Sequence, residues 1–160
     1  MAQKRYRMAM IHENMKAALK GAMIAKEEVK LRVIRGLLAG FTNELVAKRR
    51  TPQDLLTDDE AQAVIMRQVK QRKDSIEQFT NGGRADLADA EKEELAILEA
   101  FLPAQMSEEE IRAVIEKKKV EAGAIDPKQM GQFTGSIIKE LKGKADGALV
   151  KKIADEMFAK

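Results

Sequence analysis

The chain has 160 residues, of which 44% are hydrophobic and 34% are charged, so it can bury a core beneath a well-solvated surface. It contains no cysteine, which excludes disulfides, thiolate catalysis and cysteine-ligated zinc. No apolar run approaches the roughly 20 residues of a membrane span, and the basic segment Met1–Met8 lacks the apolar stretch of a secretory signal. We therefore expect a cytoplasmic protein without a membrane segment.

Charge is unevenly distributed along the chain. The first 50 residues contain 12 Lys and Arg against 4 Asp and Glu, whereas residues 51–100 contain 6 against 12. A basic N-terminal segment could attract phosphate. Alternatively, the acidic second segment neutralises it when the two pack together, and the sequence leaves both interpretations open.

Apolar residues recur at helical spacing through the first hundred residues. A first helix is predicted over 10–25, with Gly21 as an alternative earlier end, and a second carries an apolar stripe from Val33 to Leu45. Thr57 and Glu60 have the spacing of a capping box that starts a third helix, which Asn81-Gly82-Gly83 ends. A fourth helix ends before Pro103.

Three shorter helices follow. Ser107 and Glu110 form a second capping box, and that helix stops at Gly123. Asp126-Pro127 starts the next helix, which Gly143 breaks, and Asp146 caps the last one. The predicted fold is all-α. An antiparallel bundle of about four helices occupies residues 1–102, a connector residues 103–106, and a small three-helix domain residues 107–160.

No catalytic constellation is evident. His12 is the one histidine, so it cannot form a metal cluster alone, and we expect it to be structural. Most carboxylates stand where helix starts favour them, and no phosphate loop of the Walker or dinucleotide type occurs. We therefore predict no catalytic residue, no metal and no cofactor.

The segment from residue 130 to residue 152 is rich in glycine and lysine. Gly131 and Gly135 share one helix face, and each costs roughly 1 kcal/mol relative to alanine, so close approach of another backbone, from a neighbouring helix or an RNA strand, is expected to compensate. Gly143 and Gly147 bracket the start of the last helix, which suits phosphate binding or a tight interhelical turn equally. The candidate binding residues are Gly131, Gly135, Lys139, Lys142, Gly143, Lys144, Lys151 and Lys152.

Several short motifs occur together in a specific order. They are Leu31-Arg32-Val33-Ile34-Arg35, Lys70-Gln71-Arg72-Lys73-Asp74-Ser75, Gly83-Arg84-Ala85-Asp86-Leu87, Glu94-Leu95, Leu102-Pro103, Met130-Gly131, Gly135 and Gly143-Lys144-Ala145-Asp146-Gly147. In this combination the chain resembles the GatB/YqeY family, from about Met10 to the end, with the architecture of its stand-alone YqeY-like members.

The resemblance implies a relation to tRNA. In this family the C-terminal part is similar to the tail of the B subunit of tRNA-dependent amidotransferase, which helps to hold tRNA. It implies an accessory tRNA-binding module, with the lysines above contacting phosphates. Two alternatives are a protein-interaction module docking on glutaminyl-tRNA synthetase or the amidotransferase, and a carbon–nitrogen ligase with glutamine as amido-N-donor. A family label of ligase activity would be inherited from the larger enzyme, so we expect no independent catalysis.

Overall fold

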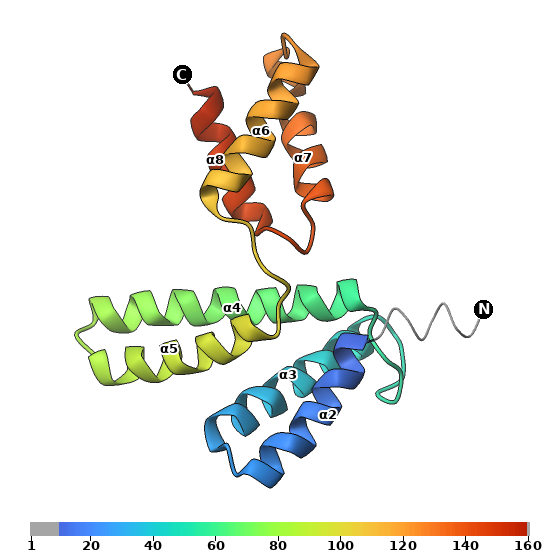
Figure 1. Ribbon diagram of the computed structural model, residues 1–160, viewed down its shortest axis with the longest axis vertical. Coiled ribbons are helices and arrows are strands. Elements are labelled where there is room, and N and C mark those ends of the chain that lie inside the picture. The colour runs from blue at the N-terminus through green and yellow to red at the C-terminus, as the bar shows by residue number, and fades with distance from the viewer. Residues whose placement is uncertain (1–9, 160) are drawn as a thin grey trace. The chain divides into compact units, whose positions relative to one another are not determined.

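The computed structural model describes residues 10–159, and over that range it is helical, with seven α-helices, one 3-10 turn and no strand (Figure 1). The prediction of an all-α fold is confirmed. The chain divides into two compact units between Leu102 and Pro103, called here the bundle and the tail. The expectation about Met1–Met8 lies outside the described residues.

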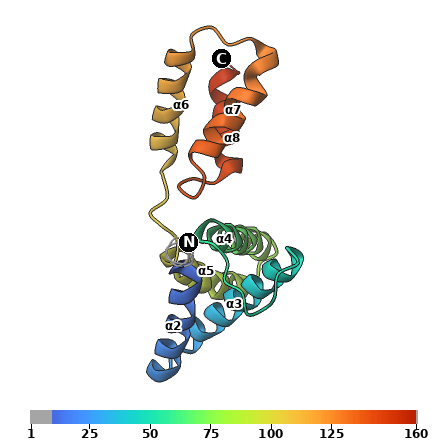
Figure 2. The same ribbon diagram turned by 90° about the vertical axis from the view of Figure 1, so that its right-hand side faces the viewer.

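The bundle consists of two helical hairpins. Helices α2 (Met10–Ala25) and α3 (Glu28–Ala47) form the first, and α4 (Asp58–Asn81) and α5 (Ala85–Ala100) form the second. Both hairpins can be followed in the turned view of Figure 2. Helix α3 packs against both α4 and α5, and α2 also contacts α4. The two hairpins therefore share one core instead of forming separate pairs.

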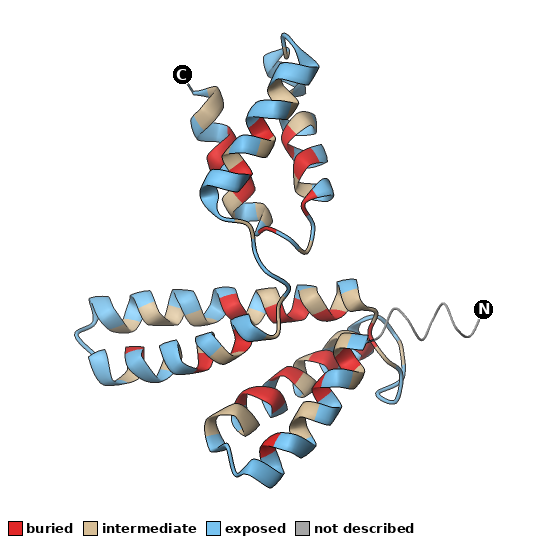
Figure 3. Ribbon diagram, in the orientation of Figure 1, coloured by how far each residue is buried: buried red, intermediate tan, exposed pale blue. Residues whose placement is uncertain are grey.

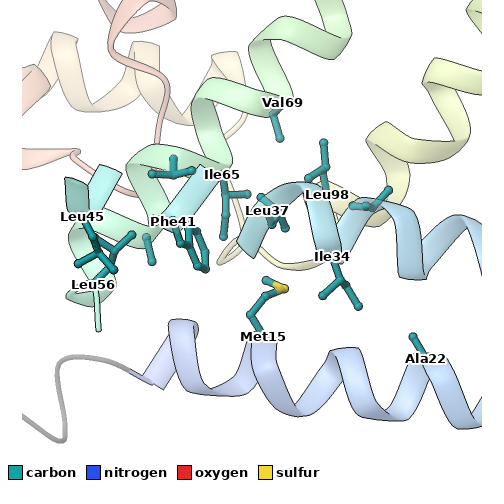
Figure 4. Packing of buried hydrophobic residues seen from close by; sticks show 13 residues of the cluster. Met15, Ala22, Ile34, Leu37, Phe41, Leu45, Leu56, Ile65, Val69 and Leu98 are labelled. Atoms are coloured by element: carbon teal, nitrogen blue, oxygen red, sulfur yellow. The ribbon is translucent and has the colours of Figure 1, made fainter. Parts of the chain in front are cut away.

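That core follows the apolar stripe predicted for α3. Val33, Ile34, Leu37, Phe41 and Leu45 are all buried, as the spacing predicts. Figure 4 shows that Met15 and Ile65 lie near this stripe, and both belong to the same cluster. The buried positions recur along one side of each helix, as the periodicity of an amphipathic helix requires (Figure 3).

Local capping explains the start of α4. Thr57 Oγ1 accepts a hydrogen bond from the Glu60 N–H at 3.3 Å, and the Glu60 carboxylate accepts one from the Thr57 N–H at 2.9 Å. The predicted capping box is thus confirmed. The alternative end at Gly21 is wrong, because α2 continues to Ala25 and the chain turns at Lys26, whose φ is 56°.

The tail contains α6 (Glu108–Ala122), a 3-10 turn (Pro127–Gln129), α7 (Met130–Glu140) and α8 (Gly147–Phe158). Its own core is formed by Ile111, Ile115, Ile137, Leu141, Ala145, Val150, Ile153 and Ala154. The second predicted capping box is confirmed. The sequence predicts that Gly143 breaks this helix, but α7 ends three residues earlier, at Glu140. The next residue, Leu141, has left the helix and is buried in the core of the tail.

Candidate nucleic-acid interface

The five candidate lysines lie at the corner between α7 and α8. Lys139 is in the last turn of α7, Lys142 and Lys144 are in the loop, and Lys151 and Lys152 follow the first turn of α8. All five are exposed. We call these five residues the corner lysines. They come from only 14 consecutive residues, so the chain gathers them locally without the help of a distant segment.

The corner lysines make no ion pair within residues 10–159. Other cations of the tail do, since Arg112 contacts Glu156 at 2.6 Å and Lys118 contacts Glu140 at 2.7 Å. Glu140 follows Lys139 in sequence, yet its carboxylate is engaged by Lys118, whose pKa this ion pair raises. The corner thus presents positive charge that the described chain does not neutralise.

Gly131 and Gly135 face open space. A Cβ atom added at either position would meet no heavy atom within 4 Å, apart from the helix's own backbone and adjacent residues. No neighbouring helix in the described part of the chain therefore explains the two glycines. Of the two interpretations left open by the sequence, packing against a neighbouring helix therefore has no support among residues 10–159, and approach of an RNA strand stays a prediction.

The other two glycines of the segment serve the fold. Gly143 has φ of 82°, a conformation that residues with a Cβ rarely adopt. A Cβ at Gly147 would lie 3.1 Å from Cγ2 of Ile138, so its absence lets α8 pack closely on α7. Gly143 and Gly147 thus form the tight interhelical turn that was one of the two interpretations.

The start of α8 is partly occupied by the chain itself. The Asp146 carboxylate accepts a hydrogen bond at 3.0 Å from the backbone N–H of Ala148. An incoming phosphate would compete with this carboxylate for the N–H groups of the first turn and would be repelled by its charge. The lysines, and not the helix start, are consequently the stronger part of the candidate site.

The connector holds the lysine loop in place. The Met106 N–H donates to the Lys144 carbonyl at 2.8 Å, and Gln105 Nε2 donates to the Gly143 carbonyl at 3.1 Å. A bridge between Lys142 and Ala145 closes the loop. These contacts to the loop backbone orient the loop and leave the lysine side chains exposed.

His12 is buried in the bundle and has a structural role. Its Nδ1 accepts a hydrogen bond at 3.0 Å from the N–H of Leu56, and its ring packs 5.0 Å from that of Phe41. Burial lowers the pKa of His12, and the nearby positive charges of Lys16 and Arg50 lower it further. The neutral imidazole thereby holds the loop before α4 against α2.

A cluster of charged side chains in the bundle joins α3, α4 and α5. The Arg32 Nε donates to Oε1 of the buried Glu94 at 2.8 Å. The other carboxylate oxygen lies 2.5 Å from Arg72 Nη2, although the angle is not that of a hydrogen bond. Arg72 also donates to Glu91 at 2.9 Å. Sequence inspection missed this cluster, because Arg32 and Glu94 are 62 residues apart.

Contacts of this kind neutralise part of the basic N-terminal segment. Arg32 contacts Glu94, and Arg50 and Lys48 both contact Glu60, at 2.9 and 3.4 Å. These pairs bring charges of the first 50 residues onto the acidic second segment. Packing of the two segments therefore neutralises these three cations, although other cations of the first 50 residues make no such contact.

Within residues 10–159, no group of three or more His, Asp or Glu side chains is arranged to hold a metal ion. No helix in that range has the length and apolar character needed to cross a membrane.

Comparison with known proteins decides the family. The family described as "Yqey-like protein" matches residues 12–158, which is nearly the whole chain. This chain belongs to the YqeY-like family. The match covers both the bundle and the tail.

Curated relatives of this YqeY-like chain include fungal proteins named "Altered inheritance of mitochondria protein 41, mitochondrial". The protein of Pyrenophora tritici-repentis is 30% identical over 91% of this chain and 80% of its own length. That of Kluyveromyces lactis is 32% identical over the same shares. The match to that of Lachancea thermotolerans is 38% identical but covers 56% of this chain and only 46% of the relative.

These names correct the expected location. Composition and the lack of a signal favoured a cytoplasmic protein, and that prediction is wrong, because the relatives are named as mitochondrial proteins. The physical reason is that neither cysteine content nor a missing apolar signal distinguishes the cytoplasm from the interior of an organelle.

Proposed function

We propose that this YqeY-like protein is an accessory tRNA-binding module whose tail contacts the RNA backbone. The observation that supports it most is the combination of exposed corner lysines, without ion pairs in residues 10–159, and the open helix face at Gly131 and Gly135. Phosphates are attracted by the lysines, and a glycine face allows a sugar–phosphate strand to approach the helix backbone closely.

The resemblance of the tail to that of the amidotransferase B subunit favours tRNA over other nucleic acids. The scarcity of aromatic residues, five Phe and one Tyr, argues against base stacking as the main source of affinity. Binding should therefore depend mainly on phosphates. The logarithm of the association constant should fall with the logarithm of salt concentration, by roughly 0.7–0.9 per phosphate contact.

A titration with unfractionated tRNA tests the proposal. The variant Lys142→Glu/Lys144→Glu is expected to bind much more weakly than the wild type, with a shallower salt dependence. A matched control is Lys92→Glu/Lys117→Glu, which changes the net charge equally at exposed positions, one in each unit. Equal affinity of the two double variants, or no binding by the wild type at low salt, would refute the proposal.

The alternative is a protein-docking module. The tail forms a buried core of eight residues by itself, so its core does not call for such a partner. A pull-down with and without ribonuclease separates the two proposals. Partners that survive ribonuclease would favour docking on a synthetase or amidotransferase, and partners that are lost would favour tRNA.

A further inference from the structure

The outer surface of α3 is positively charged. From Val29 to Asn43 the helix carries Lys30, Arg32 and Arg35 and no carboxylate. Lys30 is paired with Glu27 at 3.1 Å. Arg35 is exposed and makes no ion pair within residues 10–159.

Arg32 and Arg35 are neighbours on this surface. Residues three apart on a helix lie side by side, and both precede the exposed Gly36. A Cβ at Gly36 would meet no heavy atom within 4 Å, so the helix is open on that side beside the two arginines, although the Gly36 carbonyl accepts a hydrogen bond from Gln68 Nε2 of α4 at 3.3 Å. This repeats in the bundle the pairing of cations with an open glycine that the tail shows at α7.

Arg32 is also held in a defined orientation. Glu94 is 7% exposed and accepts from the Arg32 Nε, while the Arg32 side chain itself is 63% exposed. Only Nε of the guanidinium is engaged in the described contacts, so both Nη groups remain available to an oxyanion. A buried carboxylate that engages one edge of a guanidinium leaves the other as a planar pair of donors, which matches a phosphate group.

The remaining contacts stabilise that arrangement. Arg72 lies against the second oxygen of Glu94 and is itself held by Glu91. The carboxylate therefore has a cation on each side and cannot easily turn away from Arg32.

We infer that Arg32 and Arg35 form a second phosphate-binding site for RNA, located on α3 of the bundle, with Glu94 as the residue that positions Arg32. The inference rests on the proposed tRNA-binding function and extends the RNA contact to both units. It gives the bundle a binding role in addition to its structural one.

Arg35→Glu is the first test, because Arg35 has no described partner to lose. Titration of the full-length variant with unfractionated tRNA at low salt should show an affinity about three- to tenfold below the wild type and a salt slope smaller by about 1. The control Lys92→Glu has nearly the same charge change and loses only an exposed ion pair with Asp89 at 3.1 Å, and Lys92 lies two residues before Glu94, on a different face of α5. Equal affinities of the two variants would overturn the site.

Two further variants test whether binding needs the guanidinium of Arg32 and its contact with Glu94. Arg32→Lys keeps the net charge but loses the guanidinium, so we expect an affinity about threefold or more below the wild type. Glu94→Gln removes a negative charge, which should strengthen binding if only net charge matters and weaken it if Glu94 positions Arg32. Thermal melting shows whether each variant is folded. If Glu94→Gln does not fold, the affinity of Arg32→Lys decides whether the guanidinium of Arg32 contributes to binding.

The outcomes separate this inference from the proposed function. Loss of affinity in the tail variant Lys142→Glu/Lys144→Glu but not in Arg35→Glu would leave the proposed function standing and overturn the bundle site. Loss in Arg35→Glu but not in the tail variant would support the bundle site and refute the tail proposal. No tRNA binding by the wild type would overturn both.

Discussion

In the bundle, four arginines contact carboxylates on other helices or loops, whereas the corner lysines of the tail contact none within residues 10–159. The four are Arg32, Arg50, Arg67 and Arg72. Long-range pairs of this kind hold helices in register, although those at the surface contribute little energy individually. Similar cation content can therefore stabilise helix contacts in one unit and stay without ion pairs in the other.

Glycines differ between the two units in a similar way. A Cβ at Gly40 in the bundle would lie 2.8 Å from Gln68 Nε2 and 3.1 Å from Val64 Cγ1, so α3 and α4 pack closely there. Gly131 and Gly135 in the tail meet nothing within 4 Å. The first glycine is required by packing inside the chain, and the other two are not. The predictions below test these differences.

The largest expected effect concerns the separate cores. Phe41 is completely buried in the bundle core and shares no cluster with the tail. Phe41→Ala should lower the free energy of unfolding of the bundle by about 3–5 kcal/mol, because it removes buried area and leaves a cavity. Urea unfolding measures this, with hydrogen exchange of α6–α8 as the internal control. Equal loss of protection in the tail would show that the two units unfold together.

The next effect concerns His12. His12→Ala should destabilise the bundle by about 1–3 kcal/mol, because it leaves the buried Leu56 N–H without its acceptor. The wild type should also lose stability as pH falls below the ordinary value of 6.5. The unfolded chain takes up a proton there, whereas the lowered pKa keeps the folded imidazole neutral. Below the folded pKa, the loss should level off.

His12→Asn provides the control for the pH effect. Its side-chain oxygen can still accept a hydrogen bond but does not titrate in this range. Thermal melts of the wild type and of this variant from pH 8 to pH 5 should therefore diverge below about 6.5. Parallel curves would show that other groups cause the pH dependence.

A smaller effect separates two glycines of one helix. Gly40→Ala should destabilise the bundle by about 0.5–2 kcal/mol, because forcing the added methyl group against Val64 and Gln68 costs more than alanine gains as a helix former. Gly36→Ala is the matched control and should stabilise α3 by about 0.5–1 kcal/mol, because alanine favours the helix and the space is open. Denaturant midpoints compare the two. The same sign for both would contradict the close packing at Gly40.

The smallest change in stability should come from Gly135→Ala in the tail. With open space around the position, the alanine should stabilise α7 by about 0.5–1 kcal/mol. If an RNA strand approaches this face, the same variant should bind tRNA more weakly despite its greater stability. Melting and tRNA titration of one preparation measure both quantities. Increased stability with unchanged affinity would remove Gly135 from the proposed interface.

The sequence predicted most features that depend on nearby residues. The capping boxes at Thr57 and Ser107 and the caps at Asp126 and Asp146 are confirmed, because a cap links residues only two or three positions apart. The family resemblance also came from short ordered motifs, and the match to the YqeY-like family confirms it. The role of the candidate lysines stays a prediction.

Contacts between distant residues had no such signal. Glu94 looks like an ordinary helical carboxylate in the sequence, and only the packing of α5 near α3 shows that it is buried against Arg32. Equally, Gly36 and Gly40 are both glycines inside α3, but only at Gly40 would an added Cβ meet side chains of α4 within 4 Å.

The sequence by itself thus determined the helices, their caps and the apolar stripes, because helix formation depends on residues within a few positions of each other. The tertiary structure decided which charges are neutralised, which glycines are covered and why His12 is neutral. Those properties depend on what a distant helix places beside a side chain, and burial against that helix sets both its solvation and its partners.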